Sequence, residues 1–241
     1  MESSEIQKLA NDILNFTNAR SVFLYGSRAR DDFYGESDYE VGVLMERSKY
    51  LGRSTIKENL QIKEVNIFPF YYEDFLAGDP DTPFVKSIYM REIIEAGKTL
   101  AGEKVIENMK SPAITLLDIL ADVRFNLGYS LAATHSYRNG DNATASLHLS
   151  KSCLFGTRDY VIFKVGKLPT TYSGILQELK NLDLGEYSEL PAYAYKLRRR
   201  EVQLNERDLF ENISYLNKFI EPILLNEFWK SGNITCIDPS N

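Results

Sequence analysis

The sequence is short of the residues that build zinc sites, disulfide frameworks and membrane spans. Among its 241 residues are two cysteines, two histidines and one tryptophan, and no apolar run is long enough to cross a bilayer. Cys153 and Cys236 lie in unrelated contexts, and His135 and His148 do not cluster with them. These absences exclude a zinc finger and a disulfide-stapled secreted domain. We expect a reducing cytoplasmic setting, with neither a signal peptide nor a transit peptide.

Positive charge is also scarce. Lys and Arg number 28 against 34 Asp and Glu, which gives a formal net charge of −6 and an isoelectric point near 5.2. Because such a surface repels the phosphate backbone, we expect no nucleic-acid partner. The 44% hydrophobic and 26% charged residues are typical of a folded globular chain.

The first half of the chain alternates helical and strand patterns. The predicted elements are a helix over 5–17, strands over 21–25, 38–45 and 62–70, and a helix over 82–96 that Gly97 ends. Short strands separated by helices or loops indicate a small sheet flanked by helices. We therefore expect an α/β (α+β) domain with a small mixed sheet over residues 1–105.

The second half is helical almost throughout. The segment 102–112 is polar and lacks an apolar period, so the domain boundary is placed there, and an all-α bundle is expected over 110–230. The predicted helices cover 114–134, 143–165, 174–182, 193–215 and a segment to Trp229 in which Pro222 marks a kink or break. Residues 231–241 are expected to form a frayed tail.

The most informative stretch is YGSRARDDFYGESDYEV, residues 25–41. Gly26 permits a sharp turn after a strand and the close approach of a ligand. Ser27 stands where a helix would begin, which is a phosphate-binding arrangement, and Arg28 and Arg30 add cationic donors. The pattern predicts that Gly26 and Ser27 hold the phosphates of a nucleotide, with Arg28 assisting.

Acidic residues follow at strand spacing. Asp38 and Glu40 are two apart on a predicted strand, so both carboxylates lie on one face and offer Mg²⁺ hard oxygen ligands. Glu64 alternates with the apolar Val65 and shares a face with Asn66, so it can join them if the two strands are neighbours. Three carboxylates around one or two metal ions can activate a hydroxyl and hold a triphosphate in line.

Each part of this pattern has a structural alternative. A Gly-Ser turn is common in proteins, and Asp-x-Glu on a strand often marks the solvated face of an antiparallel sheet. The combination of a strand, Gly26-Ser27, ten residues, Asp38 and Glu40 and then Glu64 on another strand favours a metal–nucleotide site.

The span FLYGSRARDDFYGESDYEVGVLM resembles the nucleotidyltransferase superfamily of DNA polymerase β type. The segments SDYE and KEVNI are especially similar to the kanamycin nucleotidyltransferase branch, in which the second and third acids are both Glu. REIIEAGKTLAG, residues 91–102, resembles the way small members close this domain. The resemblance covers about residues 1–105. It implies Mg²⁺ or Mn²⁺ on Asp38, Glu40 and Glu64, and transfer of a nucleoside monophosphate from an NTP to a hydroxyl with release of pyrophosphate.

The helical half resembles a HEPN-type domain over 143–176, notably in Arg158-Asp159 and VGKLPTTYSGI. Ribonuclease members of that family carry Arg, four to six residues, then His, and neither histidine here has an arginine at that spacing. In kanamycin-type enzymes a glutamate of the helical domain deprotonates the acceptor. No residue matches it by motif, and Asp118 and Asp122, on one helix face, are the candidates.

The sequence thus predicts a metal-dependent nucleotidyltransferase moving an NMP, expected to be AMP. The acceptor would be a hydroxyl of a small molecule, such as an aminoglycoside-like compound, or of a protein, held in the interdomain cleft. The alternative is a non-catalytic nucleotide-binding regulator or antitoxin-like module. The apolar helical domain would also allow a homodimer.

Overall fold

The computed structural model describes residues 3–30, 32–33 and 37–238. The chain divides into two compact units, one up to Pro112 and one from Ala113 onward. The division falls at the end of the polar segment 102–112. None of the helices in these described ranges is long and apolar enough to cross a membrane.

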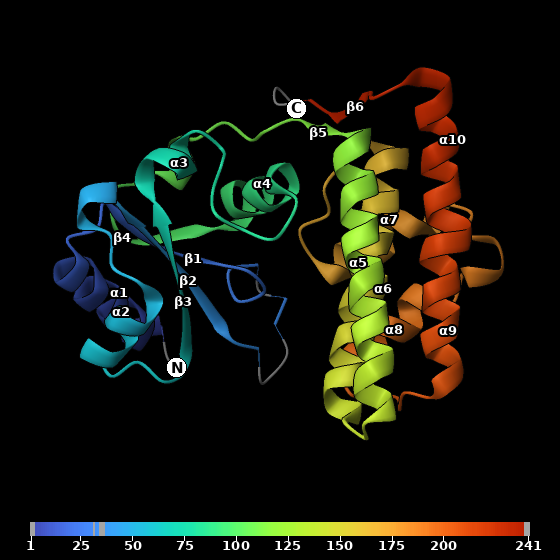
Figure 1. Ribbon diagram of the computed structural model, residues 1–241, viewed down its shortest axis with the longest axis horizontal. Coiled ribbons are helices and arrows are strands. Elements are labelled where there is room, and N and C mark those ends of the chain that lie inside the picture. The colour runs from blue at the N-terminus through green and yellow to red at the C-terminus, as the bar shows by residue number, and fades with distance from the viewer. Residues whose placement is uncertain (1–2, 31, 34–36, 239–241) are drawn as a thin grey trace. The chain divides into compact units, whose positions relative to one another are not determined.

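The first unit is built on a four-stranded mixed sheet in the order β3–β2–β1–β4 (Figure 1). β1 pairs antiparallel with both β2 and β4, whereas β2 and β3 are parallel. The expected small mixed sheet is thereby confirmed. Its elements are α1 (Ser3–Thr17), β1 (Ser21–Tyr25), β2 (Tyr39–Met45), η1 (Arg47–Lys49), α2 (Arg53–Asn59), β3 (Val65–Tyr71), α3 (Tyr72–Leu76), α4 (Lys86–Ala96), β4 (Lys98–Gly102) and η2 (Ile106–Asn108).

Helices cover both faces of this sheet (Figure 1). α1 and α2 pack on the face that carries Val43 and Ile67, and α3 and α4 pack on the face that carries Phe23 and Phe70. Since β2 is buried on both faces from Val41 to Met45, its sequence changes there from alternating to continuously apolar. Each such fully buried side chain stabilises the fold by about 1.5–3 kcal/mol.

The second unit is a helical bundle, as expected, with a short two-stranded pair added to it. The long helices α5 and α6 lie side by side, and α9, η5 and α10 follow one another along the same bundle (Figure 1). Its elements are β5 (Ile114–Thr115), α5 (Leu116–Arg138), α6 (Asn142–Val165), α7 (Tyr172–Glu178), η3 (Leu179–Asn181), η4 (Gly185–Tyr187), α8 (Leu190–Arg198), α9 (Glu206–Ser214), the π-helical η5 (Tyr215–Ile220), α10 (Glu221–Ser231) and β6 (Thr235–Ile237).

The predicted helix over 193–215 is wrong, because the chain breaks between α8 and α9. The Asn205 side chain accepts from the Asp208 backbone N–H, and the Asp208 carboxylate accepts from the Asn205 N–H. This capping box starts a new helix. Pro222 does not interrupt the helix. It lies in the first turn of α10, directly after the π-helical η5, where its missing N–H is tolerated.

The tail expected over 231–241 is also wrong for its described part. β6 pairs antiparallel with β5, and the Ile237 side chain is only 3% exposed. The Leu116 N–H donates to the Ile234 carbonyl at 2.9 Å, and the Leu117 N–H donates to Asn233 Oδ1 at 2.9 Å. The C-terminal segment therefore satisfies backbone donors at the start of α5 that would otherwise lack an intrahelical partner.

Candidate active site

The sheet register brings three polar positions to one edge of the first unit. Tyr25 at the end of β1 is paired with Glu40 at the start of β2, and Glu40 is paired with Asn66 at the start of β3. Paired residues of neighbouring strands lie on the same face of a sheet. These three side chains therefore share the face that α3 and α4 cover, which we call the acid face.

Asp38 belongs to the same face. It precedes β2 by one residue, its side chain is exposed, and its Oδ2 accepts a hydrogen bond from Asn66 Nδ2 at 3.1 Å. Glu40 is half-buried. The structure thus places the Asp38 and Glu40 carboxylates on one face with an amide beside them. Asn66, which the sequence pattern placed on this face without a role, holds one of the two carboxylates.

Glu64 lies directly before β3, outside the residues that pair with β2. The paired region begins with Tyr39 of β2 and Val65 of β3, so the exposed Glu64 precedes Val65 as Asp38 precedes Tyr39. No ladder hydrogen bond fixes Glu64, and no three His, Cys, Asp or Glu side chains in the described part of the chain are placed to hold one metal ion. Its role as a third acid stays a prediction.

Gly26 is required by the space that Glu40 occupies. Its φ of +73° is in the left-handed region, and a Cβ at this position would collide with the Glu40 carboxylate. The expected helix after Gly26 does not form in the described residues. The N–H groups of Ala29 and Arg30 donate instead to the Gly26 carbonyl, at 3.2 and 3.4 Å, and close turns. A phosphate would thus meet the Ser27 hydroxyl and turn amides, without a helix dipole.

The two arginines of this turn are held against the protein. Arg28 Nε donates to the Ser37 carbonyl at 3.0 Å, and its guanidinium lies 4.6 Å from the Tyr39 ring centroid. Arg30 forms a 3.3 Å ion pair with Glu92 of α4, and its side chain is 8% exposed. Both cationic donors predicted from the sequence thus have partners within the protein. Arg28 links the turn to the segment that carries Asp38, and nucleotide binding by it stays a prediction.

Two tyrosine hydroxyls line the acid face beside Glu40. The Tyr89 hydroxyl donates to the Tyr25 hydroxyl at 3.0 Å. Burial raises the pKa of Tyr25 well above its ordinary value, and the neighbouring Tyr89 and Glu40 raise it further. Burial also raises the pKa of Tyr89. Both phenols therefore stay protonated and act as neutral hydrogen-bonding groups. Tyr89 had no signal in the sequence, because only the packing of α4 on the sheet brings it to Tyr25.

The two candidate bases of the helical unit have structural partners. Asp118 forms a capping box with Thr115 at the start of α5. Asp122 is buried and accepts from Arg158 Nη2 at 2.8 Å, in a network that includes the fully buried Asp159. Burial raises the pKa of Asp159 well above its ordinary value, and the neighbouring Asp122 carboxylate raises it further. These contacts give Asp118 and Asp122 structural roles, in helix capping and in a buried ion pair.

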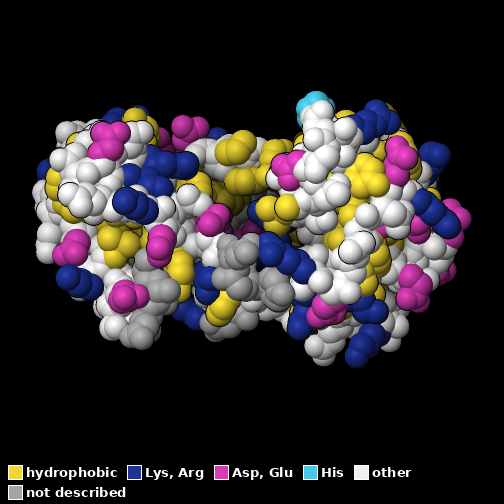
Figure 2. All heavy atoms as spheres, turned by 90° about the horizontal axis from the view of Figure 1, so that it is seen from below, with side chains coloured by type: hydrophobic (Ala, Val, Ile, Leu, Met, Phe, Trp, Pro, Cys, Tyr) yellow, Lys and Arg dark blue, Asp and Glu magenta, His cyan; other side chains and the backbone are white. Residues whose placement is uncertain are grey.

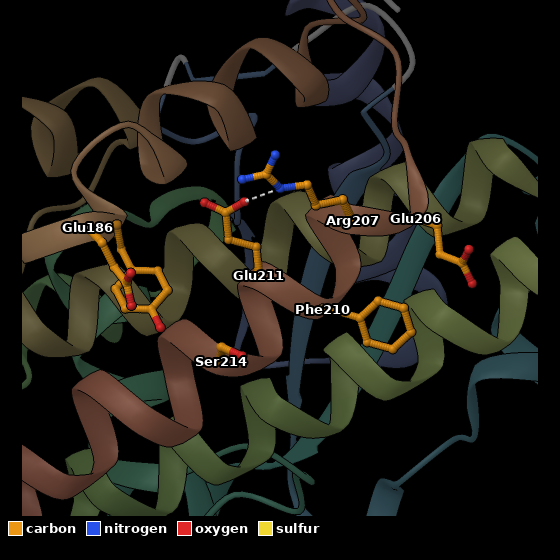
Figure 3. Close-up of a pocket in the computed structure, with 7 residues that line it drawn as sticks. Glu186, Glu206, Arg207, Phe210, Glu211 and Ser214 are labelled. Carbon is orange, nitrogen blue, oxygen red and sulfur yellow. Dashed lines mark ion pairs between the residues drawn. The ribbon is translucent and has the colours of Figure 1, made fainter.

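A hollow of about 730 Å³ in the helical unit is lined by acidic and aromatic side chains (Figure 3). Arg207 and Glu211, one turn apart on α9, form a 3.9 Å ion pair, and the other charged groups of the lining are Glu186 and Glu206. Three carboxylates against one guanidinium disfavour a phosphate chain. On the face of the molecule in Figure 2, basic and acidic side chains are interspersed over both units. The acid face with its Gly-Ser turn remains the candidate nucleotide site.

Comparisons with known proteins bear on the fold. The sequence matches no protein-family model and no curated protein. In three dimensions the chain is similar to the crystal structure of the spectinomycin adenyltransferase AAD(9) from Enterococcus faecialis with ATP and spectinomycin. The TM-score is 0.57 at 14% sequence identity, covering 89% of this chain and 96% of that one. The chain therefore shares the fold of that adenyltransferase structure. The roles of Asp38 and Glu40 stay predictions, and so does the HEPN resemblance.

Proposed function

We propose that this protein is a metal-dependent nucleotidyltransferase that moves AMP from ATP to a hydroxyl group. The acceptor is a small molecule of aminoglycoside-like chemistry or, as a second class, a protein. The observation that carries this proposal is the pair of carboxylates, Asp38 and Glu40, on one face beside the Gly26–Ser27 turn. The nucleotidyltransferase fold, shared with a protein solved with ATP and spectinomycin, supports it.

The donor set on the acid face fits Mg²⁺ or Mn²⁺. The Asp38 and Glu40 carboxylates and the Asn66 amide oxygen are hard oxygen ligands, which these ions prefer. When bound, such an ion neutralises the charge of the triphosphate and activates an oxygen nucleophile. Asp38 and Glu40 are the proposed metal ligands, and Glu64 is proposed as the third acid, beside the attacking hydroxyl.

The other residues of this face position the reactants. Asn66 orients the Asp38 carboxylate through its amide N–H. Gly26 leaves room for the Glu40 carboxylate, and the Ser27 hydroxyl next to it donates to a phosphate oxygen. Glu64 accepts the proton of the attacking hydroxyl, whose oxygen forms a bond to the α-phosphorus as pyrophosphate leaves.

The test is release of pyrophosphate from labelled ATP, GTP, CTP and UTP with Mg²⁺ and pooled hydroxyl-bearing acceptors, aminoglycosides included. We expect ATP to be used, and Asp38→Ala and Glu40→Ala to lose turnover while circular dichroism and melting stay native. Both side chains lie at the solvated end of the sheet, outside its core. Full activity in Asp38→Ala would reject the assignment.

A second function is a nucleotide-binding regulator or antitoxin-like module without turnover. The observation that favours it is the lack of a three-acid metal group among the residues that the structure describes. Calorimetry separates the two functions, because a regulator binds ATP in the presence of Mg²⁺ but releases no pyrophosphate with any acceptor. Turnover that depends on Glu64 would exclude the regulator.

A further inference from the structure

Arg53 brings a positive charge to the β3 edge of the acid face, although α2 itself packs on the opposite face of the sheet. Arg53 opens α2, and its guanidinium lies over the Phe68 ring, 4.5 Å from the ring centroid. Phe68 follows Asn66 by two residues on the same face of β3, about 6.6 Å along the strand. It also makes an edge contact with Tyr25, at 5.6 Å between ring centroids. The guanidinium therefore lies beside the row that Tyr25, Glu40 and Asn66 form.

Arg53 differs from the other arginines of the first unit in its partners. Most of these have a carboxylate partner: Arg20 has Glu103 at 2.9 Å, Arg30 has Glu92 at 3.3 Å, Arg47 has Asp74 at 2.7 Å and Arg91 has Glu95 at 2.5 Å. Arg28 donates to a backbone carbonyl. Arg53 is exposed, and within the described ranges no ion pair or hydrogen bond involves it. Its N–H donors remain available to a ligand.

Electrostatics connect Arg53 with the turn that carries Ser27. The Arg53 charge opposes the raised pKa of Tyr25, the residue directly before Gly26. The pKa of Tyr50 is raised first by burial and then by Tyr71 and Asp81, whereas Arg53 lowers it. Stacking on Phe68 restricts the guanidinium plane but leaves its edge free for two parallel N–H···O bonds. This edge geometry suits phosphate oxygens.

We propose that Arg53 is a second phosphate-binding residue of the acid face, in addition to Ser27, and binds the phosphate chain of a nucleoside triphosphate. The inference rests on the proposed function. A polyphosphate brought towards two carboxylates is repelled by them, and a stacked, unpaired guanidinium on the same face offsets that repulsion. Arg53 thus makes the face selective for nucleotides with a phosphate chain over nucleosides.

The experiment compares ligands that differ in phosphate content. Calorimetric titrations with ATP, pyrophosphate and adenosine, each with Mg²⁺, are made on the wild type, Arg53→Gln, Arg53→Lys and Arg47→Gln. Arg47 is the matched control, because it also stacks on a β3 ring, that of Tyr71 at 4.3 Å, but is paired with Asp74. We expect Arg53→Gln to weaken ATP and pyrophosphate by about 10- to 100-fold and to leave adenosine unchanged.

Arg53→Lys should fall between the wild type and Arg53→Gln, because a lysine keeps the charge but loses the planar fork. Arg47→Gln should bind all three ligands as the wild type does. If Arg53→Gln binds ATP and pyrophosphate like the wild type, the Arg53 assignment is overturned while the nucleotidyltransferase proposal stands. Equal weakening of adenosine would also overturn it, as a structural effect. A wild type that neither binds ATP nor releases pyrophosphate removes both proposals.

Discussion

At the scale of single residues, the space beside Glu40 determines where its carboxylate points. Gly26 lies against it with a φ of +73°, so an alanine there brings both backbone strain and a collision with Glu40. Strain of this kind costs about 1–2 kcal/mol for an L-residue. The first prediction separates the strain from the collision.

Gly26→Ala should lower the free energy of unfolding by about 1–2 kcal/mol and abolish most turnover, because the Glu40 carboxylate must move. Gly78→Ala is the control, since Gly78 has the same φ of +73° but no atom lies within 4 Å of the place that an alanine Cβ would take. It should lose similar stability and keep its activity. Urea denaturation and pyrophosphate release measure the two effects, and equal activity in both variants would contradict the role given to Gly26.

The role of Glu64 is the second prediction. If Glu64 takes the proton of the acceptor, Glu64→Gln should lower turnover by about 10²- to 10⁴-fold and leave ATP binding intact. Glu58→Gln, which removes another exposed carboxylate from the first unit, should leave turnover unchanged. Single-turnover kinetics with saturating ATP is the measurement. Unchanged turnover in Glu64→Gln would assign the chemistry to Asp38 and Glu40 alone.

Strand alternation was enough to predict that Asp38 and Glu40 share a face, because the period of a strand is fixed at two residues. Contacts between distant segments could not be predicted in this way. Tyr89 reaches Tyr25 only through the packing of α4, and Arg53 reaches Phe68 from a helix that follows β2. Such contacts depend on tertiary packing, which no local period encodes.

At the scale of elements, the three-residue β6 fastens the C-terminal segment to β5 at the start of α5. It closes the first turn of α5 and buries Ile237, which is 3% exposed, whereas Ile234 nearby is 36% exposed. The third prediction compares these two isoleucines. Ile237→Ala should lower the free energy of unfolding by about 2–4 kcal/mol, and Ile234→Ala by less than about 1 kcal/mol. Chemical denaturation monitored by circular dichroism measures both free energies of unfolding. Equal losses of stability in the two variants would mean that Ile237 does not anchor β6.

Long helices were predicted well because α5 and α6 carry apolar residues over many turns. Short elements were not. β5 has two residues and β6 has three, which is too few for a period, so their pairing depends on tertiary contact alone. The break before α9 had a local signal, since Asn205 and Asp208 are spaced as a capping box, but apolar periodicity across the gap concealed it.

At the scale of the whole molecule, one buried carboxyl group should make stability depend on pH. The pKa of Asp159 is raised by burial first and then by Asp122. The folded protein therefore keeps a proton that an unfolded aspartate releases near pH ~4. Stability from this group is complete below that pH and falls as pH rises towards the folded pKa, by about 1.4 kcal/mol per pH unit.

The fourth prediction follows from this sign. Asp159→Asn keeps a donor towards Asp122 but removes the titration, so its stability relative to the wild type should grow between pH ~4 and 7. The urea midpoint of both proteins across this range is the measurement. A constant difference would show that Asp159 is ionised in the folded state or that Asn disturbs the network around Arg158.

The pairing of β5 with β6 also constrains the order in which a ribosome allows the chain to fold. The sheet of the first unit is complete once β4 has emerged, since β4 supplies its last strand. The helical unit instead joins β5, near its start, to β6, which ends at Ile237. Its closing contacts cannot form until all of its helices have been synthesised. The sheet of the first unit can thus be assembled while the helical unit is still being synthesised.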